Sequence, residues 1–153
     1  MSLHHAQVSW TLGDGDFRRR RYSRLHTLSF AAGIEVVGSA SPSVVPKPWA
    51  SDDAVDPEAA FTAALSACHM LTFLDLASRA GFVATAYCDR AEGELAKNPA
   101  GKMAVTRVTL RPQITWAGEK LPDSTELDTL HHAAHELCFI ANSVLTEVVV
   151  EAV

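Results

Sequence analysis

The feature that most constrains this chain is an apolar segment, residues 56–81, with a helix signal at each end. Asp56 is a favourable N-cap, Pro57 suits the first helical position, and Gly81 follows the last periodic residue as a C-cap. These ends predict a helix of about seven turns. Apolar residues occur nearly all round it, so we expect a buried helix rather than one lying half in water. The exceptions form a narrow polar stripe: Thr62, Ser66, His69, Thr72, Asp75 and Arg79.

Alternating polar and apolar residues before this helix predict three strands. Residues 7–12 and 22–30 alternate on either side of the turn residues 13–16, which indicates a hairpin, and residues 34–39 form a third strand. The proline-containing stretch 41–55 is expected to be a surface loop.

Two further β-like runs and a second helix follow. Residues 82–95 and 103–116 predict a hairpin, because Asn98-Pro99-Ala100-Gly101 supplies turn chemistry between them. A second helix begins at Pro122-Asp123-Ser124, and residues 142–153 predict a last strand. The order β-β-β-α-β-β-α-β favours a single α+β domain, residues 1–153, with an antiparallel sheet.

Charge and hydropathy narrow the class of partner. Thirteen Lys and Arg against eighteen Asp and Glu give a net charge of -5, the wrong sign for a chain whose main partner is nucleic acid or anionic lipid. The one basic run is Arg18–Arg21, which we interpret as a solvated strand edge or turn. No apolar stretch reaches the ~18 residues expected of a membrane helix, and no leader pattern is visible. We therefore expect a cytoplasmic protein that binds neither nucleic acid nor membrane.

The chain has three cysteines, Cys68, Cys88 and Cys138, an odd number that excludes a complete disulfide framework. A cysteine is reactive where a cation stabilises its thiolate, and Arg24, on one face of the second predicted strand, is a candidate cation. Glu58 is a candidate anion for the same arginine. The alternative is a structural Arg–Glu pair with Cys68 as an inert filler. Cys88 has no cationic neighbour in sequence, and we interpret it as structural.

A metal site is a second alternative for the histidines. His131, His135 and Cys138 lie at positions i, i+4 and i+7 of the second helix, and Cys68 or His69 would add a ligand. No Cys-x-x-Cys or His-Glu-x-x-His spacing is present, so we favour a chain without a metal or other cofactor.

Two segments resemble the OsmC/Ohr family, named for osmotically inducible protein C and organic hydroperoxide resistance protein. Residues 56–70 (DPEAAFTAALSACHM) resemble its central-helix signature, and residues 135–143 (HELCFIANS) resemble its second-cysteine motif. Residues 22–26 and 39–42 also fit the OsmC-like subgroup. Phe139 stands where many members have proline, and His69 where the Ohr branch usually has an aromatic residue.

The resemblance implies a thiol peroxidase that reduces organic hydroperoxides in oxidative stress defence, built as an intertwined homodimer. It implies that Cys68 is the peroxidatic cysteine, Cys138 the resolving cysteine, Arg24 the residue that stabilises the thiolate and Glu58 the carboxylate that holds Arg24. Residues 18–21 are rivals to Arg24. The family's reductant is a dithiol, in some members protein-bound lipoamide. Around these residues we expect supporting polar groups, namely His69, His26, Tyr22 and Asn142. We expect the substrate to be lined by Phe61, Met70 and Leu71.

Helix geometry separates Glu58 from Cys68 within one chain. Glu58 and Cys68 are ten residues apart, which places them about 15 Å apart along one straight helix. We therefore expect Glu58, with Arg24, to approach Cys68 of the other chain. Two other functions stay open: a non-catalytic protein that binds a small apolar ligand at the dimer interface, and a stress protein that binds a metal through His and Cys.

Overall fold

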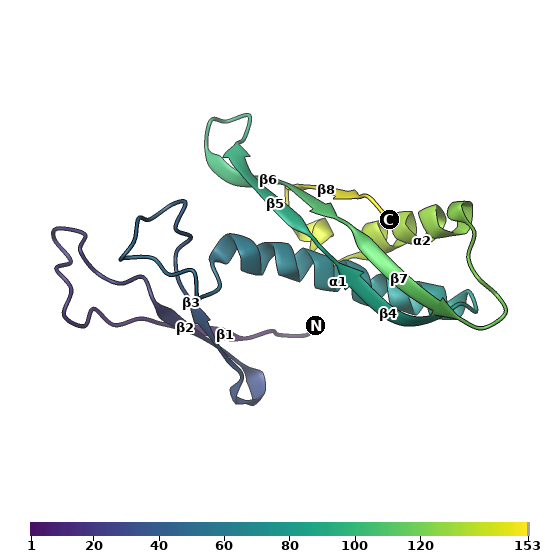
Figure 1. The fold of residues 1–153 in the computed structure, drawn as a ribbon, viewed down its shortest axis with the longest axis horizontal. Coiled ribbons are helices and arrows are strands. Elements are labelled where there is room, and N and C mark those ends of the chain that lie inside the picture. Colours follow the sequence, from purple (N-terminus) through teal and green to yellow (C-terminus); the bar gives the residue numbers. More distant parts are fainter. Residues whose placement is uncertain (153) are drawn as a thin grey trace. The chain divides into compact units, whose positions relative to one another are not determined.

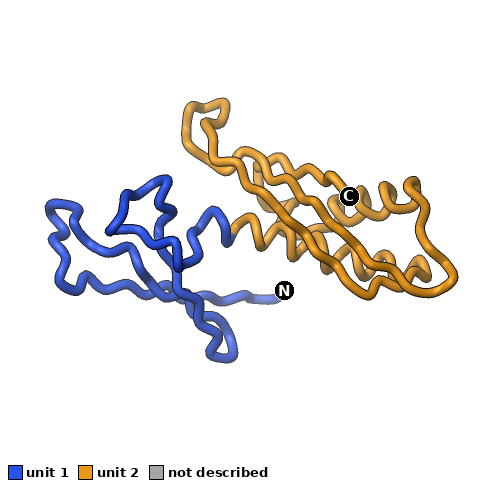
Figure 2. The backbone as a smooth tube through the Cα atoms, viewed as in Figure 1, with its two compact units in different colours: residues 1–60 blue, residues 61–153 orange. Residues whose placement is uncertain are grey.

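The structure is a computed structural model that describes residues 1–152 as two compact units, residues 1–60 and residues 61 onward (Figure 2). The strands are β1 (Ala6–Ser9), β2 (His26–Phe30), β3 (Glu35–Gly38), β4 (Val83–Asp89), β5 (Glu92–Lys97), β6 (Met103–Leu110), β7 (Pro112–Ala117) and β8 (Glu147–Val150). The helices are α1 (Pro57–Arg79) and α2 (Ser124–Leu137), with short 3-10 turns at Ala31–Gly33 and Ala141–Ser143 (Figure 1). The predicted α+β class and order of elements are confirmed. Val153, at the end of the predicted last strand, lies outside the described residues.

Capping residues are present at the ends that the sequence predicts for the two helices. The Asp56 carboxylate accepts a hydrogen bond from Ala59 N at 2.8 Å, and Gly81 has the positive φ of a C-cap, +83°. At α2, Asp123 and Glu126 form a reciprocal capping box, with Glu126 N donating to Asp123 Oδ1 at 2.8 Å and Asp123 N to Glu126 Oε2 at 3.0 Å.

The N-terminal unit is built on the antiparallel sheet β1-β2-β3. Its first two strands are shorter than predicted, because β1 ends at Ser9 and β2 begins at His26. The alternation in between belongs to an aromatic cluster: Tyr22 lies 4.9 Å from Phe17 and 5.4 Å from Trp10, measured between ring centroids. The indole of Trp10 also donates to Ser23 O at 2.8 Å. The predicted antiparallel pairing of the first two strands is therefore confirmed, but a longer loop connects them than the turn at residues 13–16 predicts.

The predicted hairpin of the C-terminal unit is present, but each arm is divided into two strands. β4 pairs with β7 and β5 with β6, both antiparallel. The break follows Asp89, whose carboxylate accepts a hydrogen bond from Arg111 N at 2.6 Å, and precedes Pro112, which has no N–H to donate. β8 lies parallel to β6, with Val148 opposite Val108, so antiparallel pairing holds for every other named strand pair of residues 1–152.

The core of the C-terminal unit lies along one face of α1. Phe73 packs with Phe82 and with Ala134 of α2, and Leu65 packs with Val108 and Leu110 of β6. The other face of α1, which carries Ala63, Ala64, Ala67 and Leu71, is exposed in the single chain. This outer face is therefore apolar at these four positions and is not part of the core of the C-terminal unit.

α1 is also long and apolar enough to cross a membrane by length and composition alone, with a mean hydropathy of 1.4 over 18 residues. This corrects the expectation that no segment reaches that length. The core helix of a globular protein passes the same test, and the inner face of α1 packs on the strands of its own unit.

Candidate active site

The two cysteines of the family-like motifs meet in the C-terminal unit. Cys68 lies on the middle of α1 and is partly exposed, whereas Cys138 caps the C-terminus of α2 and is 1 % exposed. Their thiols are close enough to share a hydrogen bond, and both are free. Phe139 does not prevent this approach, because α2 ends at Leu137 and the side chain of Phe139 is 82 % exposed.

Cys138 is a thiol that holds its proton. Burial raises the pKa of Cys138 above its usual value, and the hydrogen bond with Cys68 raises this pKa further. The turn after α2 partly opposes this effect, since Ala141 N lies 3.5 Å from Cys138 Sγ as a hydrogen-bond donor. A protonated Cys138 thiol can donate a hydrogen bond to the Cys68 sulfur.

Two polar residues that the sequence did not single out for the site fix α1 against the sheet beside Cys68. Ser66 Oγ donates a hydrogen bond to Asp89 Oδ2 at 2.5 Å. The other carboxylate oxygen of Asp89 accepts from Arg111 N, so Asp89 links α1 to both arms of the hairpin. Its only signal in the sequence is an acidic residue at the end of an apolar run.

His69 faces the core and pairs with a histidine of α2. His69 Nε2 and His131 Nδ1 are 3.0 Å apart, with the side chains 1 % and 5 % exposed. Burial lowers the pKa of both imidazoles, that of His69 to about 4, and nearby histidines lower the pKa of His69 further. The predicted polar stripe of α1 is therefore partly internal, because Ser66 bonds to the half-buried Asp89 and His69 to the buried His131.

Arg24, Tyr22 and His26 lie together in the N-terminal unit. The guanidinium of Arg24 lies 3.7 Å from the centroid of the Tyr22 ring, and its Nη1 donates to Tyr22 O at 2.5 Å. His26 Nδ1 is 2.8 Å from Arg24 O. The three side chains line an open pocket of about 360 Å³ with Val8, Trp10 and Phe17. Arg24 is half-buried, whereas the four arginines at residues 18–21, its rivals in the sequence, are exposed.

The remaining predicted residues occupy several environments. Glu58 lies in the first turn of α1 in the N-terminal unit. Asn142 Nδ2 donates to Glu136 O at 2.8 Å and so closes the turn after α2. Phe61 packs in the core with Leu65, whereas Met70 is half-buried and Leu71 is 64 % exposed. Of the four predicted catalytic residues, the structure brings Cys68 and Cys138 together.

The histidines do not form the metal cluster that the sequence left open. Among residues 1–152, no group of three or more His, Cys, Asp or Glu side chains is arranged to hold a metal ion. His131 is paired with His69, and Cys138 with Cys68.

The chain is similar to proteins of one family. The family model for OsmC-like proteins matches residues 50–153. An OsmC-like protein of unknown function from Vibrio cholerae is 49% identical, with 100% of both chains covered and a TM-score of 0.97. An organic hydroperoxide resistance protein from Legionella pneumophila is 21% identical, with 99% of this chain and 97% of that chain covered and a TM-score of 0.67. The organic hydroperoxide resistance protein OhrB of Bacillus subtilis is 20% identical, with coverage of 99% and 100% and a TM-score of 0.64. No curated protein matches the sequence. The chain therefore belongs to the family of OsmC-like proteins.

Proposed function

We propose that this protein is a thiol-dependent peroxidase that reduces organic hydroperoxides to alcohols. The observation that carries the proposal is the contact between a partly exposed Cys68 and a buried, protonated Cys138. Organic hydroperoxide resistance proteins from Legionella pneumophila and Bacillus subtilis share the fold. A pair of thiols, one accessible and one sheltered, is the arrangement that a two-cysteine peroxidase needs.

The first step is attack on the peroxide. The Cys68 thiolate attacks the distal oxygen of the hydroperoxide, an S–O bond forms and the O–O bond breaks. The alkoxide leaves and takes up a proton to become the alcohol. The sulfur is oxidised by two electrons to a sulfenic acid and the peroxide is reduced by two.

The second step uses Cys138. Its sulfur attacks the Cys68 sulfenic acid, an S–S bond forms, and the hydroxyl leaves with the Cys138 proton as water. The raised pKa of Cys138 keeps that proton in place before the first step. A dithiol reductant, such as a protein-bound lipoyl group, then exchanges with the disulfide and restores both thiols. This cycle needs a reducing compartment, and we place it in the cytoplasm.

Arg24 and Glu58 complete the proposed site in a homodimer. The exposed apolar face of α1, with Ala63, Ala64, Ala67 and Leu71, is a surface that a second copy would cover. We propose that Arg24, held by Glu58, stabilises the Cys68 thiolate of the other protomer, because ten residues of helix separate Glu58 and Cys68 within one chain. Half-buried Met70 and exposed Leu71 would then line the substrate site and favour organic peroxides.

A peroxide assay tests the proposal. The wild-type protein is expected to consume cumene hydroperoxide with dithiothreitol as reductant, and Cys68→Ser to lose this activity. Cys88→Ser is the matched control, since Cys88 is an exposed free cysteine on β4, and it should keep the wild-type rate. If the wild-type protein shows no turnover and all three thiols stay free after peroxide treatment, the proposal is wrong.

Mixed dimers test the role of Glu58 across the subunits. Cys68→Ser and Glu58→Ala subunits, each inactive alone, should recover activity when mixed, because one of the two sites then has an intact Cys68 and an intact Glu58. If the mixed dimer forms and stays inactive, Glu58 does not act across the interface.

A second function is favoured by the aromatic pocket of the N-terminal unit. Trp10, Phe17 and Tyr22 give it an apolar wall, and its volume of about 360 Å³ suits a small molecule. A non-catalytic member of the family would use such a pocket to bind an apolar ligand. It would then bind such a ligand without peroxide turnover, and Trp10→Ala would remove binding.

A further inference from the structure

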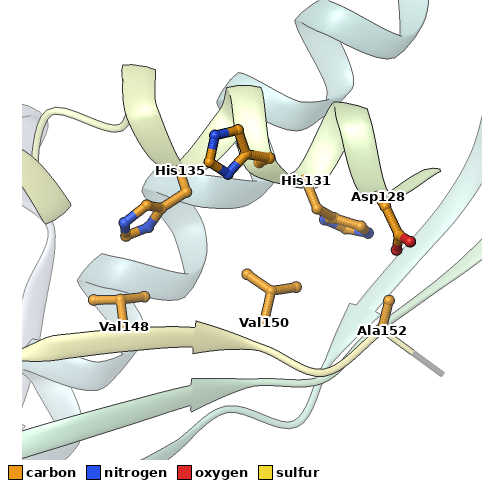
Figure 3. A pocket seen from close by; sticks show the side chains of 7 residues that line it. Asp128, His131, His135, Val148, Val150 and Ala152 are labelled. Atoms are coloured by element: carbon orange, nitrogen blue, oxygen red, sulfur yellow. The ribbon is translucent and has the colours of Figure 1, made fainter. Parts of the chain in front are cut away.

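A second pocket lies in the C-terminal unit, between α2 and β8, and neither Cys68 nor Cys138 is among its lining residues. Asp128, His131, His132 and His135 line it from α2, and Val148, Val150 and Ala152 line it from the β8 side (Figure 3). Its volume is about 310 Å³, which lies at the lower end of the range for sites that bind small molecules. The proposed peroxidase chemistry uses none of these side chains.

Two buried nitrogen atoms of residues that line this pocket have no hydrogen-bond partner among residues 1–152: His131 Nε2 and His135 Nδ1. The His131 side chain is only 5 % exposed, and its Nδ1 is already bonded to His69 Nε2. Buried polar atoms in native proteins nearly always have a partner. A ligand in the pocket would supply one for His131 Nε2.

The pocket favours a hydrogen-bond donor with positive charge. Burial lowers the pKa of His131 and of its partner His69, so both rings are neutral near pH 7. When the shared hydrogen lies on His131 Nδ1, His131 Nε2 is an acceptor. Asp128 adds a carboxylate, the only one among the described lining residues, which repels an anion and attracts a cation.

The polar groups lie at two ends of an apolar floor. In Figure 3, His131 and Asp128 lie toward one end and His135 toward the other; on the opposite side Val148 lies below His135, Val150 between the two ends and Ala152 below Asp128. A single ion would leave this floor empty, and no group of three ligands within residues 1–152 is arranged around a metal position. A chain of methylene groups would cover the valines.

We propose that this pocket binds a short aliphatic diamine. One ammonium group donates to the Asp128 carboxylate and His131 Nε2, the methylene chain lies on Val148 and Val150, and the second ammonium group donates to His135 Nδ1. Both nitrogens that lack a partner are then satisfied. Neither cysteine lines the pocket, so the proposal does not depend on the proposed peroxidase activity.

Calorimetric titration with 1,5-diaminopentane tests the proposal on the full chain. The diamine is expected to bind with one site per chain, and pentylamine to bind at least about tenfold more weakly because it leaves one end of the pocket unsatisfied. Pentanoate, with a carboxylate in place of the amine, should not bind. Equal affinity for pentylamine and diaminopentane, or no binding of the diamine, would overturn the proposal.

Two variants of α2 separate the pocket from general surface charge. Asp128→Asn should weaken diamine binding about tenfold or more, since it removes the carboxylate with little change of shape. Glu136→Gln is the matched control, because Glu136 is an exposed residue of the same helix outside the pocket lining, and it should change the affinity less than twofold.

If Asp128→Asn and Glu136→Gln lower the affinity for the diamine equally, the diamine binds only through the net charge of the protein, and the proposed site is wrong. Cys68→Ser should bind the diamine like the wild-type protein, and loss of binding there would contradict the separation from the cysteine pair. Binding of zinc chloride without binding of the diamine would also reject the proposal.

Discussion

Acid should destabilise this protein through its buried histidine pair. Burial holds the pKa of His69 at about 4 in the folded protein, against the ordinary value of 6.5 that we assign to the unfolded chain. Between pH 6.5 and pH 4 the unfolded chain binds a proton that folded His69 does not. The free energy of unfolding should therefore be fully maintained above pH 6.5 and fall as the pH is lowered.

The size of this effect follows from the two pKa values. Each unit of pKa difference corresponds to about 1.4 kcal/mol. Proton uptake by His69 in the unfolded chain should therefore lower the free energy of unfolding by about 2 kcal/mol at pH 5 and about 3 kcal/mol at pH 4. The lowered pKa of His131 acts in the same direction. A loss of this size is a large fraction of the stability of a typical domain, about 5–15 kcal/mol.

Urea unfolding followed by tryptophan fluorescence measures the effect at pH 7.5, 6 and 5, at one protein concentration and ionic strength. The variant His69→Gln cannot be protonated and keeps an amide that can bond to His131. Its free energy of unfolding should change less between pH 7.5 and pH 5 than that of the wild-type protein. His5→Gln, at an exposed position, should leave the wild-type pH dependence unchanged. Identical pH dependence in the wild-type protein and His69→Gln would refute the reasoning.

Three substitutions test the packing and capping of the C-terminal unit by urea unfolding at neutral pH. Phe73 is 0 % exposed, so Phe73→Ala should cost about 3–5 kcal/mol, and a cost below about 1 kcal/mol would contradict its place in the core. A Cβ atom at Gly93 would overlap Thr62 Oγ1, so Gly93→Ala should cost about 1–3 kcal/mol; an unchanged stability would mean that β5 and α1 are not in close contact. Asp123→Ala removes the capping box with Glu126 and should cost about 1 kcal/mol, and no loss would argue against the cap.

The sequence predicts the ends of the helices well because their signals are local. Asp56, Gly81 and Asp123 each act on atoms within a few residues. The same is true of the turn at Asn98, whose side chain accepts from Ala100 N and Lys102 N, both at 3.0 Å. Short-range chemistry of this kind does not depend on the rest of the fold.

The inner face of α1 could not be predicted, because the helix is apolar nearly all round and gives no clear direction of burial. His69 belongs to the predicted polar stripe, yet it lies in the core and bonds to His131. This burial could not be predicted, because His131 is 62 residues away in the sequence. The hydrogen-bond partners of Asp89 are also distant in the sequence: Ser66 is 23 residues away and Arg111 is 22 residues away. Such long-range pairs leave no pattern in a single sequence.

The alternation at Trp10 and Tyr22 misled the prediction for a different reason. Alternating aromatic residues predict a strand, but here the rings of Trp10, Phe17 and Tyr22 pack on one another within a loop. That Cys68 and Cys138 belong together was easier to predict, because both lie in segments that resemble motifs of the OsmC/Ohr family. Their contact depends on where α2 ends, which the structure alone provides.

The most direct test of the account is the identity of the disulfide that forms after one equivalent of cumene hydroperoxide. The reduced protein is treated in the absence of reductant, its remaining thiols are blocked, and the peptides are mapped by mass spectrometry. The account predicts one disulfide, between Cys68 and Cys138, with Cys88 blocked as a free thiol. Three blocked thiols, or a disulfide that includes Cys88, would contradict it.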